Sequence, residues 1–200
     1  MPIKAVMFDI GGVLVQQVDR TRTRYWETRL ELEEGSLGRS IWLMPISLQA
    51  EIGRASEDDV WAAVADRFEL NPIDLAALRG DYFSGSVWND QLIDYARSLR
   101  AHYRTGIISN AWPEAREAVK PWVNGNAFDD LIFSAEVGLA KPDRRIFDLA
   151  LDRLRVQPGE AIFIDDMPGN VEAAQAIGMV GIHFVNTGQS IEEIEQHLKI

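Results

Sequence analysis

The sequence predicts an α/β protein in which a doubly wound (Rossmann-like) parallel sheet carries a small helical cap domain. Two observations predict this fold. Short segments rich in Ile, Val and Phe recur along the chain, and helical patterns separate the later ones. In addition, residues 15–87 contain helical patterns and turns but no convincing strand. Strands that alternate with helices favour a parallel sheet with helices on both faces.

Composition restricts the classes of function. The chain has 200 residues, 46% of them hydrophobic and 26% charged, as in an ordinary globular protein. It has no cysteine, which excludes disulfides, thiolate metal ligands and a thiol nucleophile. The net charge of −11 argues against nucleic acid or an anionic membrane as a partner, because both require a basic face. Residues 1–4 lack signal-peptide features and no long apolar run follows, so we expect a cytoplasmic protein.

Five apolar segments are predicted to be buried strands, because each is too short for a buried helix and rich in Ile, Val or Phe. They span residues 3–8, 105–108, 131–133, 161–164 and 180–185. Helices are predicted over residues 113–123, 144–154 and 169–177, and a closing helix begins near residue 191. Ser190 and Glu193 indicate a capping box for the closing helix, and Gly178 is a C-terminal stop for the helix before it.

The interval between the first and second strands is predicted to be a helical insertion. A capping-box pattern begins at Ser56, and Asn71 followed by Pro72 is typical of a second helix start. Segment 84–86 (Ser-Gly-Ser) is a plausible hinge that returns the chain to the main domain. An apolar stripe at helical spacing joins Val60, Val64 and Phe68. We therefore expect a core of residues 1–14 and 88–200, with a cap of residues 15–87.

Polar residues follow the predicted strands at the edge where ligands bind in parallel sheets. Asp9 follows the first strand directly, and Gly11 with Gly12 allows a tight turn and close approach of a ligand. A hydroxyl and an amide after the second strand suit phosphate oxygens, and a lysine after the third supplies a cation. Taken singly, each is more often a turn or cap residue. The residues after the later strands are Ser109, Asn110, Lys141, Asp165 and Asp166.

The adjacent carboxylates Asp165 and Asp166 carry more information than the other candidates. Two neighbouring carboxylates at a strand end repel each other, and convergence with Asp9 adds a third negative charge. A hard cation compensates for this repulsion, and Mg²⁺ is commonly held by one or two carboxylates, other oxygens and water. The sequence therefore favours a magnesium site at this edge of the sheet.

The ordered set Asp, Ser, Lys and Asp-Asp, each after a strand, resembles the four motifs of haloacid dehalogenase (HAD) superfamily phosphatases with a cap inserted after the first motif. The resemblance spans essentially the whole chain. It implies that Asp9 is a nucleophile that forms an aspartyl-phosphate and that Ser109 binds the transferring phosphoryl group. It also implies that Lys141 neutralises the charge that Asp9 and the phosphate share. It further implies that Asp166 ligates Mg²⁺ directly, that Asp165 acts through water, and that the five strands lie in the order 5-4-1-2-3.

Gly11 departs from the pattern. Most phosphatases that this chain resembles have an aspartate at this position, which protonates the leaving alcohol and later activates water. The Gly11 carbonyl can still reach the metal, so the candidate metal ligands are Asp9, Gly11, Asp165 and Asp166. The candidate phosphate-binding residues are Gly12, Ser109, Asn110 and Lys141. A missing general acid or base is typically worth about 10²- to 10⁴-fold in rate.

Three functions remain open on these residues. The first is a Mg²⁺-dependent phosphatase for a small phosphorylated metabolite, such as a sugar phosphate, because some branches with Asp-X-Gly resemble working sugar-phosphate phosphatases. The second is a 2-haloacid dehalogenase, whose branch also lacks the second aspartate; it needs no metal, so the pair Asp165-Asp166 argues against it. The third is a catalytically weak or inactive HAD-fold binding protein, as a consequence of Gly11.

Overall fold

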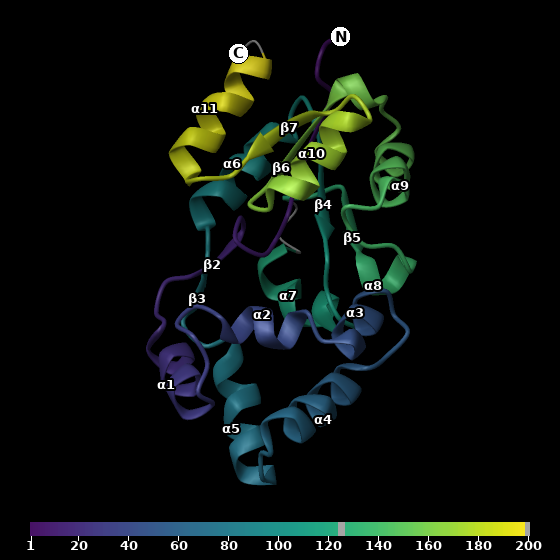
Figure 1. Ribbon diagram of the computed structural model, residues 1–200. Coiled ribbons are helices and arrows are strands. Elements are labelled where there is room, and N and C mark those ends of the chain that lie inside the picture. The colour runs from purple at the N-terminus through teal and green to yellow at the C-terminus, as the bar shows by residue number, and fades with distance from the viewer. Residues whose placement is uncertain (124–126, 199–200) are drawn as a thin grey trace.

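The computed structural model describes residues 1–123 and 127–198, and its centre is a five-stranded parallel sheet with helices on both faces (Figure 1). The sheet order is β5-β4-β1-β6-β7, with parallel pairing throughout. Numbered along the chain and read from β7 to β5, these five predicted strands lie in the order 5-4-1-2-3, so the predicted order is confirmed. The strands are β1 (Ala5–Phe8), β4 (Arg104–Ser109), β5 (Asp130–Phe133), β6 (Ala161–Asp165) and β7 (Val180–His183).

Alternate residues of the strands are buried on opposite faces of the sheet. In β1, Val6 and Phe8 belong to the cluster beneath α6 and α11, whereas Ala5 and Met7 belong to the cluster beneath α9 and α10. All four residues are at most 1% exposed. Burial on both faces explains why the strands are uniformly apolar rather than alternating. The helices around the sheet are α6 (Asp90–Leu99), α7 (Ala115–Val123), α8 (Ser134–Val137), α9 (Arg144–Leu154), η1 (Pro158–Glu160), α10 (Pro168–Ala176) and α11 (Thr187–Leu198).

The insertion after β1 is mostly helical, and its helices gather at one end of the sheet (Figure 1). They bury a separate apolar cluster that includes Trp26 and Trp61, and Trp112 from the segment after β4 joins it. Both predicted helix starts are confirmed: Ser56 forms a capping box with Asp59, and Asn71 caps the following helix. The helices are α1 (Thr21–Arg29), α2 (Leu37–Trp42), α3 (Pro45–Glu51), α4 (Glu57–Phe68) and α5 (Pro72–Tyr82).

The expectation that residues 15–87 contain no strand is wrong at both ends of the interval. Strands β2 (Val15–Gln17) and β3 (Ser86–Trp88) form an antiparallel ladder where the chain enters and leaves the insertion. Each of these strands has only three residues, and two of the three in β2 are glutamines, so neither strand shows an alternating pattern. The predicted hinge contains Gly85, which has φ +79 and whose carbonyl accepts hydrogen bonds from the backbones of Val18 and Asp19.

The predicted start of the closing helix is also wrong. Helix α11 begins at Thr187, and Ser190 lies inside its first turn rather than at its cap. Asn186 performs the capping function, since its side-chain oxygen accepts a hydrogen bond from the Gln189 backbone at 3.0 Å. Helix α6, which lies outside the predicted helices, is capped in the same way by Asn89. No helix among the described residues is long and apolar enough to cross a membrane.

Candidate active site

Asp9 lies directly after β1, at the edge of the sheet where the parallel strands end. Its backbone N–H continues the ladder to the Ile164 carbonyl at 2.9 Å, and the residue is only 7% exposed. The chain then turns tightly: the Gly12 N–H donates to the Val15 carbonyl at 2.8 Å, and Gly12 has φ +75. The strand and the turn together fix the Asp9 carboxylate at the base of the site.

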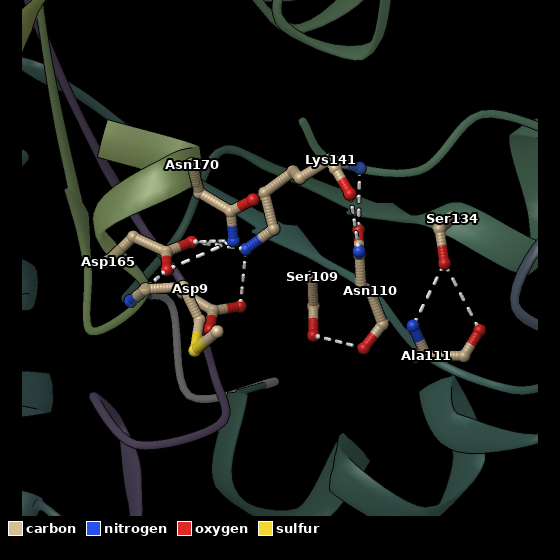
Figure 2. A network of polar contacts seen from close by, with 9 residues as sticks. Asp9, Ser109, Asn110, Ala111, Ser134, Lys141, Asp165 and Asn170 are labelled. Atoms are coloured by element: carbon tan, nitrogen blue, oxygen red, sulfur yellow. Dashed lines mark hydrogen bonds and ion pairs between the residues drawn. The ribbon is translucent and has the colours of Figure 1, made fainter. Parts of the chain in front are cut away.

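Lys141 joins two of the predicted carboxylates. Its Nζ lies 2.8 Å from Asp9 Oδ1 and 2.6 Å from Asp165 Oδ2, and all three residues are buried (Figure 2). The backbone of Lys141 is held by Asn110, whose Oδ1 accepts from the Lys141 N–H at 2.8 Å and whose Nδ2 donates to the Lys141 carbonyl at 2.9 Å. The residue after β4 therefore positions the lysine that contacts Asp9.

Asp165 is fully buried, and protein donors surround both of its carboxylate oxygens. Oδ1 accepts from the Met167 backbone at 2.8 Å and from Asn170 Nδ2 at 3.1 Å, while Oδ2 accepts from Lys141 and, at 3.1 Å, from Asn170. Because donors from the protein already bind both oxygens, the Asp165 carboxylate orients Lys141 and the start of α10.

Asp166 completes a group of three carboxylates. Each of Asp9, Asp165 and Asp166 offers an oxygen within 4.8 Å of the others. Gly12 lies directly beneath Asp166, and a Cβ at Gly12 would come within 2.3 Å of Asp166 Oδ2. Only glycine fits there, which agrees with the close approach expected of this turn. A residue that no sequence motif marked, His183, has its Nε2 3.0 Å from the Asp166 carbonyl oxygen.

The electrostatics of the site favour an added cation. The pKa of Asp9 is raised to about 6, chiefly by burial and also by the charge of Asp165, against the lowering effect of Lys141. Burial and then the charge of Asp165 also raise the pKa of Asp166. Three carboxylates thus share one lysine, and hard divalent cations bind such oxygen-rich, negatively charged groups. The donor set fits Mg²⁺.

The remaining predicted residues lie around this centre. Ser109 ends β4 and is 4% exposed. Among the described residues its hydroxyl makes one long contact, 3.4 Å to the Asn110 carbonyl, which leaves it available to an anion. Gly11 has no positive φ, and a Cβ there would meet nothing within 4 Å. The structure thus brings together Asp9, Lys141, Asp165 at the end of β6 and Asp166 after it. Ser109 ends β4, the strand that pairs with β1. Their catalytic and ligand roles stay predictions.

One buried acid of the insertion, at the end of the helix that packs on α8, was not predicted. Glu51, the last residue of α3, is 8% exposed, and burial raises the pKa of its carboxyl. A glutamate at a helix end inside an amphipathic pattern carries no local signal of function. Only the packing of the insertion on the sheet domain reveals where it lies.

Comparison with known proteins identifies the family. A family model for haloacid dehalogenase-like hydrolases matches residues 3–178. The chain belongs to this family. The predicted HAD resemblance and the predicted hydrolase are therefore confirmed. The fold agrees, since a HAD-like hydrolase from Porphyromonas gingivalis aligns over 100% of both chains with a TM-score of 0.75 at 26% identity.

Several relatives of this HAD-like hydrolase are phosphatases. It is 29% identical to the sesquiterpene phosphatase astK of Aspergillus oryzae, over 96% of this chain and 95% of that protein. It is 26% identical to the D-ribitol-5-phosphate phosphatase of Bacteroides thetaiotaomicron, over 88% of this chain and 89% of that protein. Other relatives are longer: the chain spans 39% of the rat bifunctional epoxide hydrolase 2, at 27% identity. A B. thetaiotaomicron HAD enzyme in complex with magnesium and inorganic phosphate shares the fold, with a TM-score of 0.74 at 22% identity over 90% of this chain and 93% of that one.

Proposed function

We propose that this protein is a Mg²⁺-dependent phosphatase that acts on a small phosphorylated metabolite through an aspartyl-phosphate on Asp9. The observation that carries the proposal is the buried Lys141 ammonium held between Asp9 and Asp165, with Asp166 beside them. A nucleophilic carboxylate and a fixed cation at one point suit phosphoryl transfer, in which positioning and charge stabilisation do most of the catalytic work.

The residues present fit a magnesium ion. We propose Asp9, Asp166 and the Gly11 carbonyl as its ligands. Asp165 would act on the metal only indirectly, because protein donors already surround its oxygens. When bound, Mg²⁺ would neutralise part of the negative charge on the transferring phosphoryl group. The magnesium and phosphate complex of the B. thetaiotaomicron enzyme of the same fold supports this assignment.

The side chains of this chain supply the other parts of the reaction. Asp9, ionised at neutral pH, would attack phosphorus in line with the leaving group. The Ser109 hydroxyl, which has only one long contact, would hydrogen-bond a phosphoryl oxygen, and Lys141 would balance the charge that Asp9 and the phosphate share. Asn110 positions Lys141 in this scheme, because its side-chain amide hydrogen-bonds both the N–H and the carbonyl of the Lys141 backbone.

The substrate class is proposed from the relatives and the cap. Two relatives that match nearly end to end carry the names of phosphatases, one for sesquiterpenes and one for D-ribitol 5-phosphate. We propose that residues 15–87 form a cap that selects the leaving group, while residues 1–14 and 88–200 hold the phosphoryl group. A panel of sugar, polyol and isoprenoid phosphates would identify the leaving group.

Turnover of p-nitrophenyl phosphate by the purified protein, with Mg²⁺ and with EDTA, tests the proposed function. We expect hydrolysis with Mg²⁺, its loss in EDTA, and no hydrolysis by the Asp9→Asn variant. Release of halide from 2-chloropropionate without metal would instead indicate a dehalogenase. A folded protein that binds phosphate with Mg²⁺ but turns nothing over would indicate an inactive binding protein.

A further inference from the structure

The end of β7 lies beside the Asp165–Asp166 pair. Asp165 is paired with His183 in the parallel ladder of β6 and β7, and the Phe184 N–H donates to the Asp165 carbonyl at 2.9 Å. Asp166, the next residue, lies beyond the last pair of this ladder and two residues before the start of α10. Among the described residues, its backbone therefore makes no hydrogen bond to the backbone of the sheet or of the helix.

The Asp166 carbonyl has a side chain as its partner instead. In the first turn of α10 the Asn170 N–H donates to the Met167 carbonyl at 3.0 Å, so the helical bonds begin one residue beyond Asp166. The His183 ring reaches the Asp166 carbonyl, with Nε2 3.0 Å from its oxygen. A carbonyl oxygen can only accept, so this hydrogen bond requires a proton on His183 Nε2. The bond fixes the peptide group that follows the Asp166 Cα.

The Asp166 carboxylate depends on this backbone for its orientation. Both oxygens of Asp165 accept from protein donors, whereas no side chain donates to the Asp166 carboxylate in the part of the chain that the structure describes. One contact of the carboxylate is the turn at Gly12, where a Cβ would come within 2.3 Å of Asp166 Oδ2. The carboxylate remains available to a cation, while the Gly12 turn and the His183 hydrogen bond hold the residue that carries it.

The backbone of His183 is itself fixed. His183 ends β7, and its carbonyl accepts from Gln189 Nε2 of α11 at 3.2 Å. The Gln189 side chain also accepts from the Val185 N–H at 3.3 Å, so one amide spans the turn between β7 and α11. The His183 ring is exposed, but it projects from backbone that the sheet and α11 both hold. His183 lies beyond residues 3–178, which the HAD family model matches, so the family motifs assign it no role.

We propose that His183 is a positioning residue of the metal site: its Nε2–H holds the Asp166 carbonyl and thereby orients the Asp166 carboxylate toward Mg²⁺. The proposal rests on the proposed phosphatase function and its metal ligands. His183 acts through Asp166 and takes no part in the transfer of the phosphoryl group. Hydrogen-bond partners of metal ligands are typically worth about 10- to 100-fold in metal affinity. Because the His183 ring is exposed and water competes for the hydrogen bond, we expect about 10-fold.

Isothermal titration calorimetry of the metal-free protein with Mg²⁺ alone tests this role without any substrate. His183→Ala, which removes the donor, should raise the Kd for Mg²⁺ by about 10-fold. His183→Gln, whose side-chain amide supplies an N–H donor, should recover most of the wild-type affinity. With p-nitrophenyl phosphate, the Mg²⁺ concentration for half-maximal turnover should rise in His183→Ala by the same factor. The rate at saturating Mg²⁺ should stay near that of the wild type, because the nucleophile and the phosphate-binding residues are unchanged.

His102→Ala is the matched control. His102 is also exposed, and it lies in the turn before β4, at the opposite end of that strand from Ser109. Its replacement should leave both the Kd for Mg²⁺ and the turnover at the wild-type values. Thermal melting of each variant in EDTA shows whether it is folded. If His183→Ala does not fold, His183→Leu takes its place, because leucine keeps the bulk of the side chain but offers no donor.

The outcomes separate the role of His183 from the function beneath it. A folded His183→Ala protein with the wild-type Kd for Mg²⁺ overturns this role, while its Mg²⁺-dependent turnover would still support the phosphatase. A His183→Gln protein that binds Mg²⁺ as weakly as His183→Ala also overturns it, because the donor would then not be the cause. A wild type that binds Mg²⁺ but hydrolyses no phosphate ester overturns the phosphatase, and the calorimetry still decides the role of His183. A wild type that binds no Mg²⁺ overturns both.

Discussion

Replacement of Asp9 by Asn should make the metal-free protein more stable at neutral pH. Burial raises the pKa of Asp9 from 3.8 to about 6, so the folded state holds this proton more tightly than the unfolded state does. The ionised carboxylate therefore destabilises the fold increasingly as pH rises from about 4 to about 6, and fully above that range. At about 1.4 kcal/mol per pKa unit, the cost at pH 8 is about 3 kcal/mol. Lys141 keeps Asp165 as a partner in the variant.

Urea unfolding of wild type and Asp9→Asn in EDTA, at pH 4 and at pH 8, measures this cost. The variant should gain up to about 3 kcal/mol in free energy of unfolding at pH 8 and almost nothing at pH 4, since the difference between the two proteins cancels the titration of other groups. Mg²⁺ should then stabilise the wild type more than the variant. Equal stability of the two proteins at pH 8 in EDTA would refute the electrostatic reasoning.

Four further substitutions test the geometry of the site. Asp166→Ala should lower Mg²⁺-dependent turnover by more than about 100-fold with an unchanged melting temperature, because even outer-shell partners of a metal are worth 10- to 100-fold; full turnover would refute the ligand assignment. Gly12→Ala should cost about 1–2 kcal/mol through its positive φ and displace Asp166, whereas Gly11→Ala should leave the melting temperature unchanged. Gly11→Asp, which meets no steric obstacle, should raise alkyl-phosphate turnover by up to about 10²-fold. A wild type that already hydrolyses alkyl phosphates as fast as aryl phosphates would show that no acid is missing.

The sequence was sufficient for the sheet and for the edge at which the candidate site residues gather. Strands buried on both faces leave uninterrupted apolar runs, and parallel strands end at one edge, so residues that follow them, such as Asp9 and Asp165, had to converge. The close packing of Gly12 under Asp166 also follows the expectation that the glycine pair allows close approach.

Features that depend on contacts between distant segments were not predictable. The ladder of β2 and β3 exists because the two ends of the insertion lie side by side, and neither segment has a strand pattern alone. Asn186, rather than Ser190, caps α11, because the chain enters the helix four residues earlier than the capping-box motif indicated. The end of α3 meets the sheet domain through its packing on α8, where Gly53 approaches the Ala135 carbonyl, and no local pattern encodes this contact.

Detection of a phosphoryl group on Asp9 tests the central claim most directly. Wild-type protein mixed with p-nitrophenyl phosphate and Mg²⁺, quenched in acid during turnover and digested, should yield a phosphorylated peptide that contains Asp9 and loses its phosphate on treatment with hydroxylamine. The Asp9→Asn variant and the EDTA-treated protein should yield none. Turnover with no label on Asp9, or a label on another residue, would contradict the proposed mechanism.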